Sequence, residues 1–135
     1  KHTRKEIGRM MDSLKQLNNL NPGIAYSIIP GNHDYNCSDN KKSLSLFKKN
    51  LLLAEREYKS WFIGSDKSKR NSAQEIIFNN IKIIHIGLEY LPSASGIEFA
   101  QKIINENPNK PAIIPEEIPP IAIGIIRLTN VNISI

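Results

Sequence analysis

Apolar residues near the start of the chain recur three or four positions apart, which is the spacing of one face of an α-helix. They are Ile7, Met10, Met11, Leu14, Leu17 and Leu20. This pattern predicts a helix that leads into the next apolar segment. A mixed segment over residues 41–58 suggests a second helix, because Leu44, Phe47, Leu51 and Ala54 have similar spacing.

The next apolar segment, Ile24–Ile29, is short, contains β-branched residues and follows the turn-like Asn21-Pro22-Gly23. We predict a buried strand here. It ends at Pro30 and Gly31, because proline cannot continue a β-ladder and glycine permits a sharp turn.

Two strand-like segments, residues 75–78 and 81–87, are separated only by Asn79-Asn80. This arrangement predicts a β-hairpin around a two-residue turn. His85 lies inside the second strand, and we interpret it as a packed or hydrogen-bonded strand histidine rather than a metal ligand. Together, the helical and strand patterns predict the α/β fold class.

Three polar residues, Asn32, His33 and Asp34, follow the first predicted strand, at the position where ligands usually bind in open α/β sheets. The amide oxygen of Asn32 suits a divalent metal whose other ligands are anionic. His33 can protonate a leaving oxygen or stabilise charge on a phosphoryl group. Asp34 can accept a hydrogen bond from His33, and this bond orients the imidazole of His33 and keeps that imidazole protonated. The alternative is a polar turn in which these residues serve turn chemistry alone.

Gly31-Asn32-His33-Asp34 resembles the third metal motif of the calcineurin-like metallophosphoesterases. Three later segments resemble the spacer of one branch, the calcineurin-like phosphoesterase domain-containing phosphatases and their bacterial relatives. They are Trp61-Phe62-Ile63-Gly64, Asn71-Ser72-Ala73-Gln74, and Leu88-Glu89-Tyr90 followed by Pro92. Residues 97–104 are similar to the helix that follows in that branch, and residues 107–114 to its Asn-Pro step into the next strand. The resemblance covers approximately residues 6–114.

The resemblance implies a partial four-layer α/β/β/α metallophosphoesterase sandwich over residues 1–114, followed by a divergent Ile- and Pro-rich tail over residues 115–135. It implies hydrolysis of phosphate monoesters, possible substrates being phosphoserine and phosphothreonine, with two divalent metals (Mn, Fe, Zn or Mg). Asn32 then corresponds to a metal ligand, and His33 and Asp34 correspond to catalytic residues. Glu89, just after a strand, corresponds to a structural position.

Other motifs of the family are missing. Its members place Asp-x-His and Gly-Asp-x-x-Asp before the loop, and nothing before residue 31 matches them. Where the family continues into Thr-Thr-His and later Gly-His-x-His, this chain has Pro115-Glu116-Glu117 and then no histidine. Glu117 could bind a hard cation in place of the first of these histidines, but the abrupt change favours a frameshifted or truncated end. We interpret His2 as a histidine of the chain terminus rather than as a metal ligand.

Asn32 is thus the one recognisable metal ligand, whereas a two-metal site needs several ligands from different loops. We therefore expect a fragment that has lost its amino-terminal portion, does not retain the two metals and is inactive alone. Two other hypotheses stay open. One is a metal-free binding or scaffold domain that keeps the fold without the chemistry, and the other is an unrelated α/β domain.

The resemblance implies a phosphate-ester substrate as the partner, and charge and composition argue against a nucleic-acid or membrane partner. The chain of 135 residues has a formal charge of +5. The cationic residues of two runs lack the interleaved aromatic residues of a nucleic-acid site, so we expect a solvated surface and no nucleic-acid partner. They are Lys41, Lys42, Lys48, Lys49, Lys67, Lys69 and Arg70. Cys37, the single cysteine, excludes an internal disulfide. The chain contains no apolar run of about 18 residues, so no membrane span is predicted. The sequence does not indicate a cellular compartment.

Overall fold

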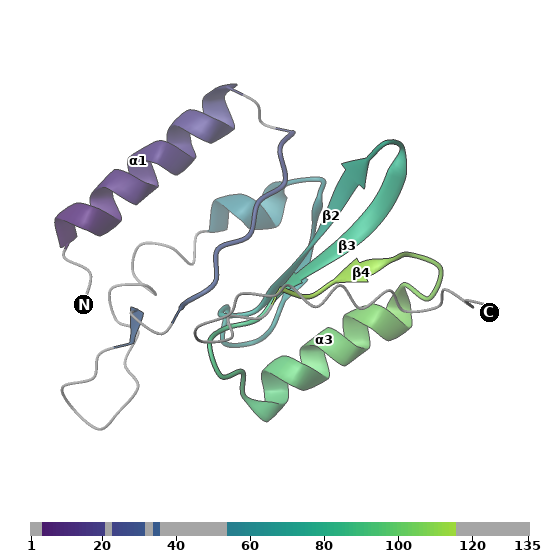
Figure 1. Ribbon diagram of the computed structural model, residues 1–135. Coiled ribbons are helices and arrows are strands. Elements are labelled where there is room, and N and C mark those ends of the chain that lie inside the picture. The colour runs from purple at the N-terminus through teal and green to yellow at the C-terminus, as the bar shows by residue number, and fades with distance from the viewer. Residues whose placement is uncertain (1–3, 21–22, 32–33, 36–53, 116–135) are drawn as a thin grey trace.

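The computed structural model describes residues 4–20, 23–31, 34–35 and 54–115. Its elements, in chain order, are α1 (Arg4–Leu20), a 3-10 helix (Ala54–Tyr58), β1 (Phe62–Ser65), β2 (Ser72–Phe78), β3 (Ile81–Gly87), α3 (Ala94–Glu106) and β4 (Ala112–Ile113). Figure 1 shows the strands side by side, with helices on either side of them. The predicted α/β class is confirmed at this general level.

The predicted hairpin is confirmed as β2 and β3, which pair antiparallel from Ser72↔Gly87 to Phe78↔Ile81. β2 begins at Ser72 rather than at Glu75. The two residues of the connecting turn, Asn79 and Asn80, have φ angles of 48° and 63°. A type I′ turn requires positive φ at both central residues, and asparagine tolerates this conformation better than most residues do.

β3, α3 and β4 form a βαβ unit, with β4 parallel to β3. The sheet order is β1-β2-β3-β4. α3 begins after Ser93, whose hydroxyl accepts a hydrogen bond from the N–H of Gly96 at 3.4 Å and so caps the helix. The helix expected over residues 97–104 and the strand that follows it are therefore confirmed. The helix is longer than expected because it starts at the Ser93 cap.

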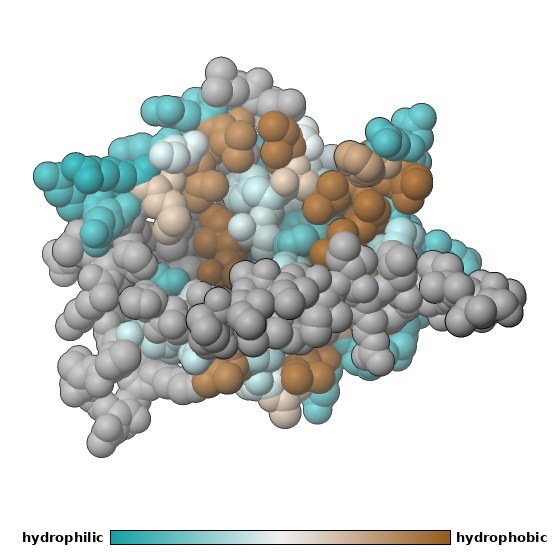
Figure 2. All heavy atoms as spheres, in the orientation of Figure 1, coloured by the Kyte–Doolittle hydropathy of each residue, from teal (hydrophilic) through white to brown (hydrophobic). Residues whose placement is uncertain are grey.

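One face of the sheet packs against α3 and forms the main core. Side chains on that face come from alternate positions, because successive residues of a strand point to opposite sides. The buried members of this core are Ala73, Ile84, Ile86, Ala100, Ile103 and Ala112. The hairpin extends beyond the core, and its end carries Ile77, Phe78 and Ile81 with exposed fractions of 65%, 63% and 54%. This apolar end is visible at the upper right of Figure 2.

Residues 24–30 cross the opposite face of the sheet, and the strand predicted over residues 24–29 is wrong. A Cβ atom added to Gly87 would lie 2.5 Å from Ser27 Oγ and 2.8 Å from Ile29 Cγ2. The segment therefore lies over β3 rather than in the plane of the sheet, as a drawn-out chain without strand pairing (Figure 1). It cannot add a ladder there, because β2 and β3 each have a strand on both sides. Most of the segment is half-buried rather than buried.

α1 lies on the far side of residues 24–30 from the sheet (Figure 1). A small cluster joins the helix to that segment and consists of Met11, Leu14, Ile28, Tyr35 and Tyr90. The predicted helix is confirmed, although its apolar face is only partly buried, with Met10 40% exposed. None of the helices in the described part of the chain has the length and apolar character needed to cross a membrane.

The four-layer sandwich stays a prediction, because the described residues form a single sheet with α3 on one face. In the described part of the segment 41–58, where a helix is predicted, the structure has the 3-10 helix Ala54–Tyr58. Residues 36–53 lie outside the described residues, so the rest of that helix stays a prediction. His2, Cys37, Glu117 and the tail from residue 116 onward also lie outside it. The proposed division of the chain at residue 114 is therefore still a prediction.

Candidate functional site

The Gly31–Asp34 loop is a turn that is closed by hydrogen bonds between its first and last residues. The N–H of Asp34 donates to the carbonyl oxygen of Gly31 at 3.1 Å, and the N–H of Gly31 donates to Asp34 Oδ2 at 2.8 Å. Short polar side chains commonly stabilise turns through such bonds to the backbone. Asn32 and His33 lie outside the described residues. The predicted contact between Asp34 and His33 therefore stays a prediction, and the described function of the Asp34 carboxylate is to close the turn.

The loop stands beside the carboxyl end of β3. The N–H of Tyr90, shortly after this strand, donates to the carbonyl oxygen of Pro30 at 3.0 Å. Pro30 is buried, and so is Tyr35, which directly follows the loop. The polar triplet was predicted to follow the carboxyl end of a strand. The adjacent strand end is that of β3, from later in the sequence, and not that of the segment preceding the loop.

Tyr35 connects the loop to a partly buried ion pair between Arg70 and Glu89. Its hydroxyl donates to Glu89 Oε2 at 2.5 Å, and Arg70 Nη1 donates to the same oxygen at 2.9 Å. The side chain of Glu89 is 3% exposed and that of Arg70 is 29% exposed. Burial, followed by the hydrogen bond and charge of Glu89, raises the pKa of Tyr35 well above its ordinary value. Burial alone would lower the pKa of Arg70, but the charge of Glu89 raises it. A neutral phenol and a guanidinium cation thus donate to one carboxylate.

Asn71 connects the cluster of Tyr35, Arg70 and Glu89 to backbone groups and to Asp66. The residue is 0% exposed. Its Oδ1 accepts from the N–H of Glu89 at 2.8 Å, and its Nδ2 donates to Asp66 Oδ2 at 3.0 Å. A Cβ atom on Gly96 would lie 2.9 Å from the same Nδ2, so the first turn of α3 packs directly on the amide. Asn71 therefore joins the loop between β1 and β2, the end of β3 and the start of α3.

Asp66 is the second buried carboxylate of the cluster, with an exposed fraction of 8%. Burial alone would raise its pKa, but hydrogen bonds from Ser68, from the Asn71 side chain and from the backbone of Asn71 and Arg70 lower it. Its folded-state pKa thus lies below its unfolded value. Asp66 stabilises the fold at pH above the ordinary aspartate pKa of about 3.9, and this contribution is lost as the pH falls through the lower folded value.

Asp66→Asn should make the stability of the chain less dependent on pH. We expect a loss of about 1–2 kcal/mol at pH 7, because hydrogen bonds to a charged acceptor are lost. Urea unfolding at pH 7 and pH 3 should show a smaller fall in free energy for the variant than for the wild type. Asp12→Asn, at an exposed position of α1, is the matched control and should keep the wild-type fall. Equal pH responses of the two variants would contradict the role given to Asp66.

The cluster retains hydrogen-bonding capacity. Glu89 Oε1 and Arg70 Nε are buried and have no hydrogen-bond partner among the described residues. The site can therefore accept one further hydrogen bond at Glu89 and donate one at Arg70. In the part of the chain that the structure describes, no group of three or more His, Cys, Asp or Glu side chains could hold a metal ion. These residues do not by themselves supply a divalent-metal ligand set, and Asn32 stays a predicted ligand.

The remaining sequence predictions have mixed outcomes. His85 is confirmed as a hydrogen-bonded strand histidine, with its Nδ1 3.5 Å from Gln74 Nε2. Glu89 is buried and hydrogen-bonded, which agrees with a structural position. Arg70 was expected on a solvated basic surface, and this is wrong because its guanidinium pairs with Glu89. Tyr35 was missed, and its place next to the loop was the only signal for it.

Comparisons with protein-family models, with curated proteins and with solved structures found no match to this chain. The resemblance noted above thus rests on the residues quoted for it, and the function is argued from those residues and their geometry.

Proposed function

We propose that this chain is part of a two-metal phosphoesterase that hydrolyses phosphate monoesters. The observation that carries the proposal is the Gly31–Asp34 loop, which is anchored on both sides. On its amino-terminal side, the carbonyl oxygen of Pro30 accepts a hydrogen bond from the N–H of Tyr90. On its carboxyl-terminal side, the hydroxyl of Tyr35 donates a hydrogen bond to Glu89. A loop that carries a metal ligand and a proton donor must be held in place by its supporting residues, because small displacements lower catalytic efficiency.

In this proposal, Asn32 offers a neutral oxygen to a divalent metal, and His33 donates a proton to the leaving oxygen or stabilises phosphoryl charge. Asp34 keeps the turn closed through Gly31 and orients His33. Two bound divalent metals (Mn, Fe, Zn or Mg) would supply Lewis acidity and an activated water. Asn32 is the one recognisable ligand for them in these 135 residues. The four-layer sandwich, with the Asp-x-His and Gly-Asp-x-x-Asp motifs, belongs to the proposed whole protein.

The chain of 135 residues should therefore show no phosphatase activity by itself. We expect para-nitrophenyl phosphate turnover with added Mn²⁺ to equal the buffer background, because one amide ligand does not hold a metal. His33→Ala should give the same background. Mn²⁺-dependent turnover that His33→Ala abolishes would contradict this prediction, since the chain would then complete a metal site itself.

The flanking DNA tests the proposal for the whole protein. We expect upstream codons for Asp-x-His and Gly-Asp-x-x-Asp, or Thr-Thr-His in a shifted frame after Ile114. The reading frame that includes them should turn over para-nitrophenyl phosphate with Mn²⁺, and His33→Ala should lower kcat. Flanking DNA without any of these codons would overturn the proposal and favour a metal-free or unrelated domain.

A further inference from the structure

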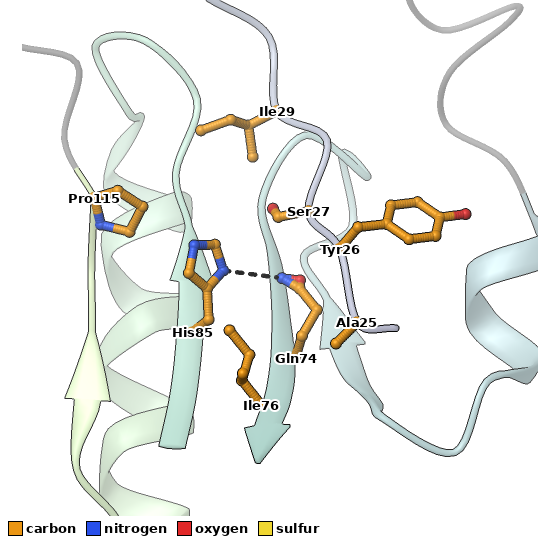
Figure 3. A pocket seen from close by; sticks show the side chains of 8 residues that line it. All are labelled: Ala25, Tyr26, Ser27, Ile29, Gln74, Ile76, His85 and Pro115. Atoms are coloured by element: carbon orange, nitrogen blue, oxygen red, sulfur yellow. Dashed lines mark hydrogen bonds between the residues drawn. The ribbon is translucent and has the colours of Figure 1, made fainter. Parts of the chain in front are cut away.

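A cavity of about 310 Å³ lies between residues 25–29 and the face of the sheet opposite α3 (Figure 3). It is lined by Ala25, Tyr26, Ser27, Ile29, Gln74, Ile76, His85 and Pro115. None of these lining residues carries a formal charge when His85 is neutral. Among the described residues, neither Gly31 nor Asp34 lines the cavity, so it does not overlap the described part of the candidate phosphoesterase site.

The cavity is a consequence of how residues 25–29 cross the sheet. Figure 3 shows Ser27 and Ile29 extending to the side of His85 and Gln74, whereas the ring of Tyr26 extends to the opposite side of the segment. The Tyr26 ring packs instead on Trp61, with centroids 5.2 Å apart. On the sheet side, Gln74 and His85 are direct cross-strand neighbours in the β2–β3 register. The absence of a side chain at Gly87 leaves room for Ser27, since a Cβ atom there would lie 2.5 Å from its hydroxyl oxygen.

Gln74 favours one tautomer of His85. Its Nε2 lies 3.3 Å from the carbonyl oxygen of Ser72 and 3.5 Å from His85 Nδ1. An amide nitrogen is only a donor, so this contact favours the neutral tautomer in which Nδ1 accepts and Nε2 carries the proton. Burial lowers the pKa of His85, which favours this neutral form at neutral pH. His85 thus keeps an N–H donor that Gln74 does not use.

Ser27 provides a second polar group that is not satisfied locally. Its Oγ is buried and has no hydrogen-bond partner among the described residues. A buried hydroxyl without a partner is unfavourable, so a ligand that hydrogen-bonds to it gains affinity. The apolar parts of Ala25, Ile29, Ile76 and Pro115 would surround the rest of such a ligand. An apolar lining with a few polar groups is the usual composition of a small-molecule site.

From this combination of volume, neutral lining, Ser27 hydroxyl and His85 N–H, we propose that the cavity binds a small uncharged aromatic ketone or related neutral carbonyl compound. The carbonyl oxygen accepts a hydrogen bond from the Ser27 hydroxyl, and the ring fills the apolar space beside His85. Charged compounds of the same size are disfavoured, because none of the described lining residues carries a charge that compensates the cost of desolvating them. A neighbouring hollow of about 570 Å³ differs in this respect, since Glu75 and Lys82 line it and pair at 2.9 Å.

The test is a titration of the ¹⁵N-labelled 135-residue chain with acetophenone, and with benzoate as a charged compound of similar size. We expect saturable amide shifts at Ala25, Ser27, Gln74 and His85 with acetophenone, and no saturable shifts with benzoate. Absence of saturation with acetophenone, equal responses to both compounds, or shifts confined to other residues would each overturn the proposal. This comparison uses the wild-type chain, so it does not depend on any variant folding.

Two serine variants sharpen the test. Ser27→Ala should weaken acetophenone binding about three- to tenfold, because one hydrogen bond to the carbonyl is lost. Ser60→Ala, which alters only the neighbouring hollow, should leave the affinity unchanged. Equal affinities of these two variants would contradict the role of Ser27. Binding that occurs only after deletion of residues 116–135 would overturn the proposal for the intact chain, because the cavity would then be filled by the chain itself.

Discussion

Glu89→Ala should destabilise the chain by about 2–4 kcal/mol, or prevent folding, because it removes the buried carboxylate to which a partly buried guanidinium and a buried phenol donate. Arg70 and the hydroxyl of Tyr35 both donate to Glu89 Oε2, and the side chain of Glu89 is 3% exposed. The substitution thus removes the oxygen to which both the Arg70 guanidinium and the Tyr35 phenol donate. Urea unfolding at pH 7, followed by circular dichroism, measures the change.

Glu98→Ala is the matched control, because Glu98 is exposed on α3. It should change the free energy of unfolding by less than about 0.5 kcal/mol. Replacing both partners, with Glu89→Leu and Arg70→Met in one chain, should recover much of the lost stability, since no uncompensated charge then remains. A Glu89→Ala variant as stable as Glu98→Ala would show that the cluster contributes nothing to folding.

Ile86→Ala should lower the free energy of unfolding by about 2–5 kcal/mol, because it leaves a cavity in the core beneath α3. Ile86 is 0% exposed and lies opposite Ala73 in the hairpin register, so no larger neighbour across the strand can fill the space. The measurement is again urea unfolding at neutral pH.

Ile77→Ala provides the control in the same hairpin. Ile77 is 65% exposed, so its replacement removes the same atoms and the same strand preference without opening a buried cavity. The expected cost is below about 1 kcal/mol. Equal losses for the two variants would contradict the placement of the core between this sheet and α3.

Several elements could be predicted because their signals lie in neighbouring residues. The hairpin follows from Asn79-Asn80 between two β-branched segments, and asparagine accepts the positive φ angles that the turn needs. α1 follows from the spacing of its apolar residues. β1 gave no comparable signal, because it is only Phe62–Ser65 and its register shifts between Phe62 and Gly64. Such a short, irregular strand has no alternation to recognise.

The segment over residues 24–29 was predicted as a strand and is not one. Its apolar, β-branched composition favours an extended backbone conformation. Whether such a chain joins a sheet depends on finding a free strand edge, and β2 and β3 offer none where the segment crosses them.

The burial of charged side chains also could not be predicted from the sequence. Arg70 stands in a basic run, and Arg56 is 3% exposed, yet neither position differs in sequence from a solvated one.

The sequence by itself determined α1, the hairpin and the turn at Gly31–Asp34, because each depends on residues that are close along the chain. It also supplied the chemical types at that loop: an amide, an imidazole and a carboxylate. Only the tertiary structure decided that the loop stands at the end of β3 and that Tyr35 meets Glu89, 54 residues later. Local propensity acts between neighbours in the chain. Burial and charge pairing depend on which distant residues the fold brings together, and no pattern along the chain encodes that choice directly.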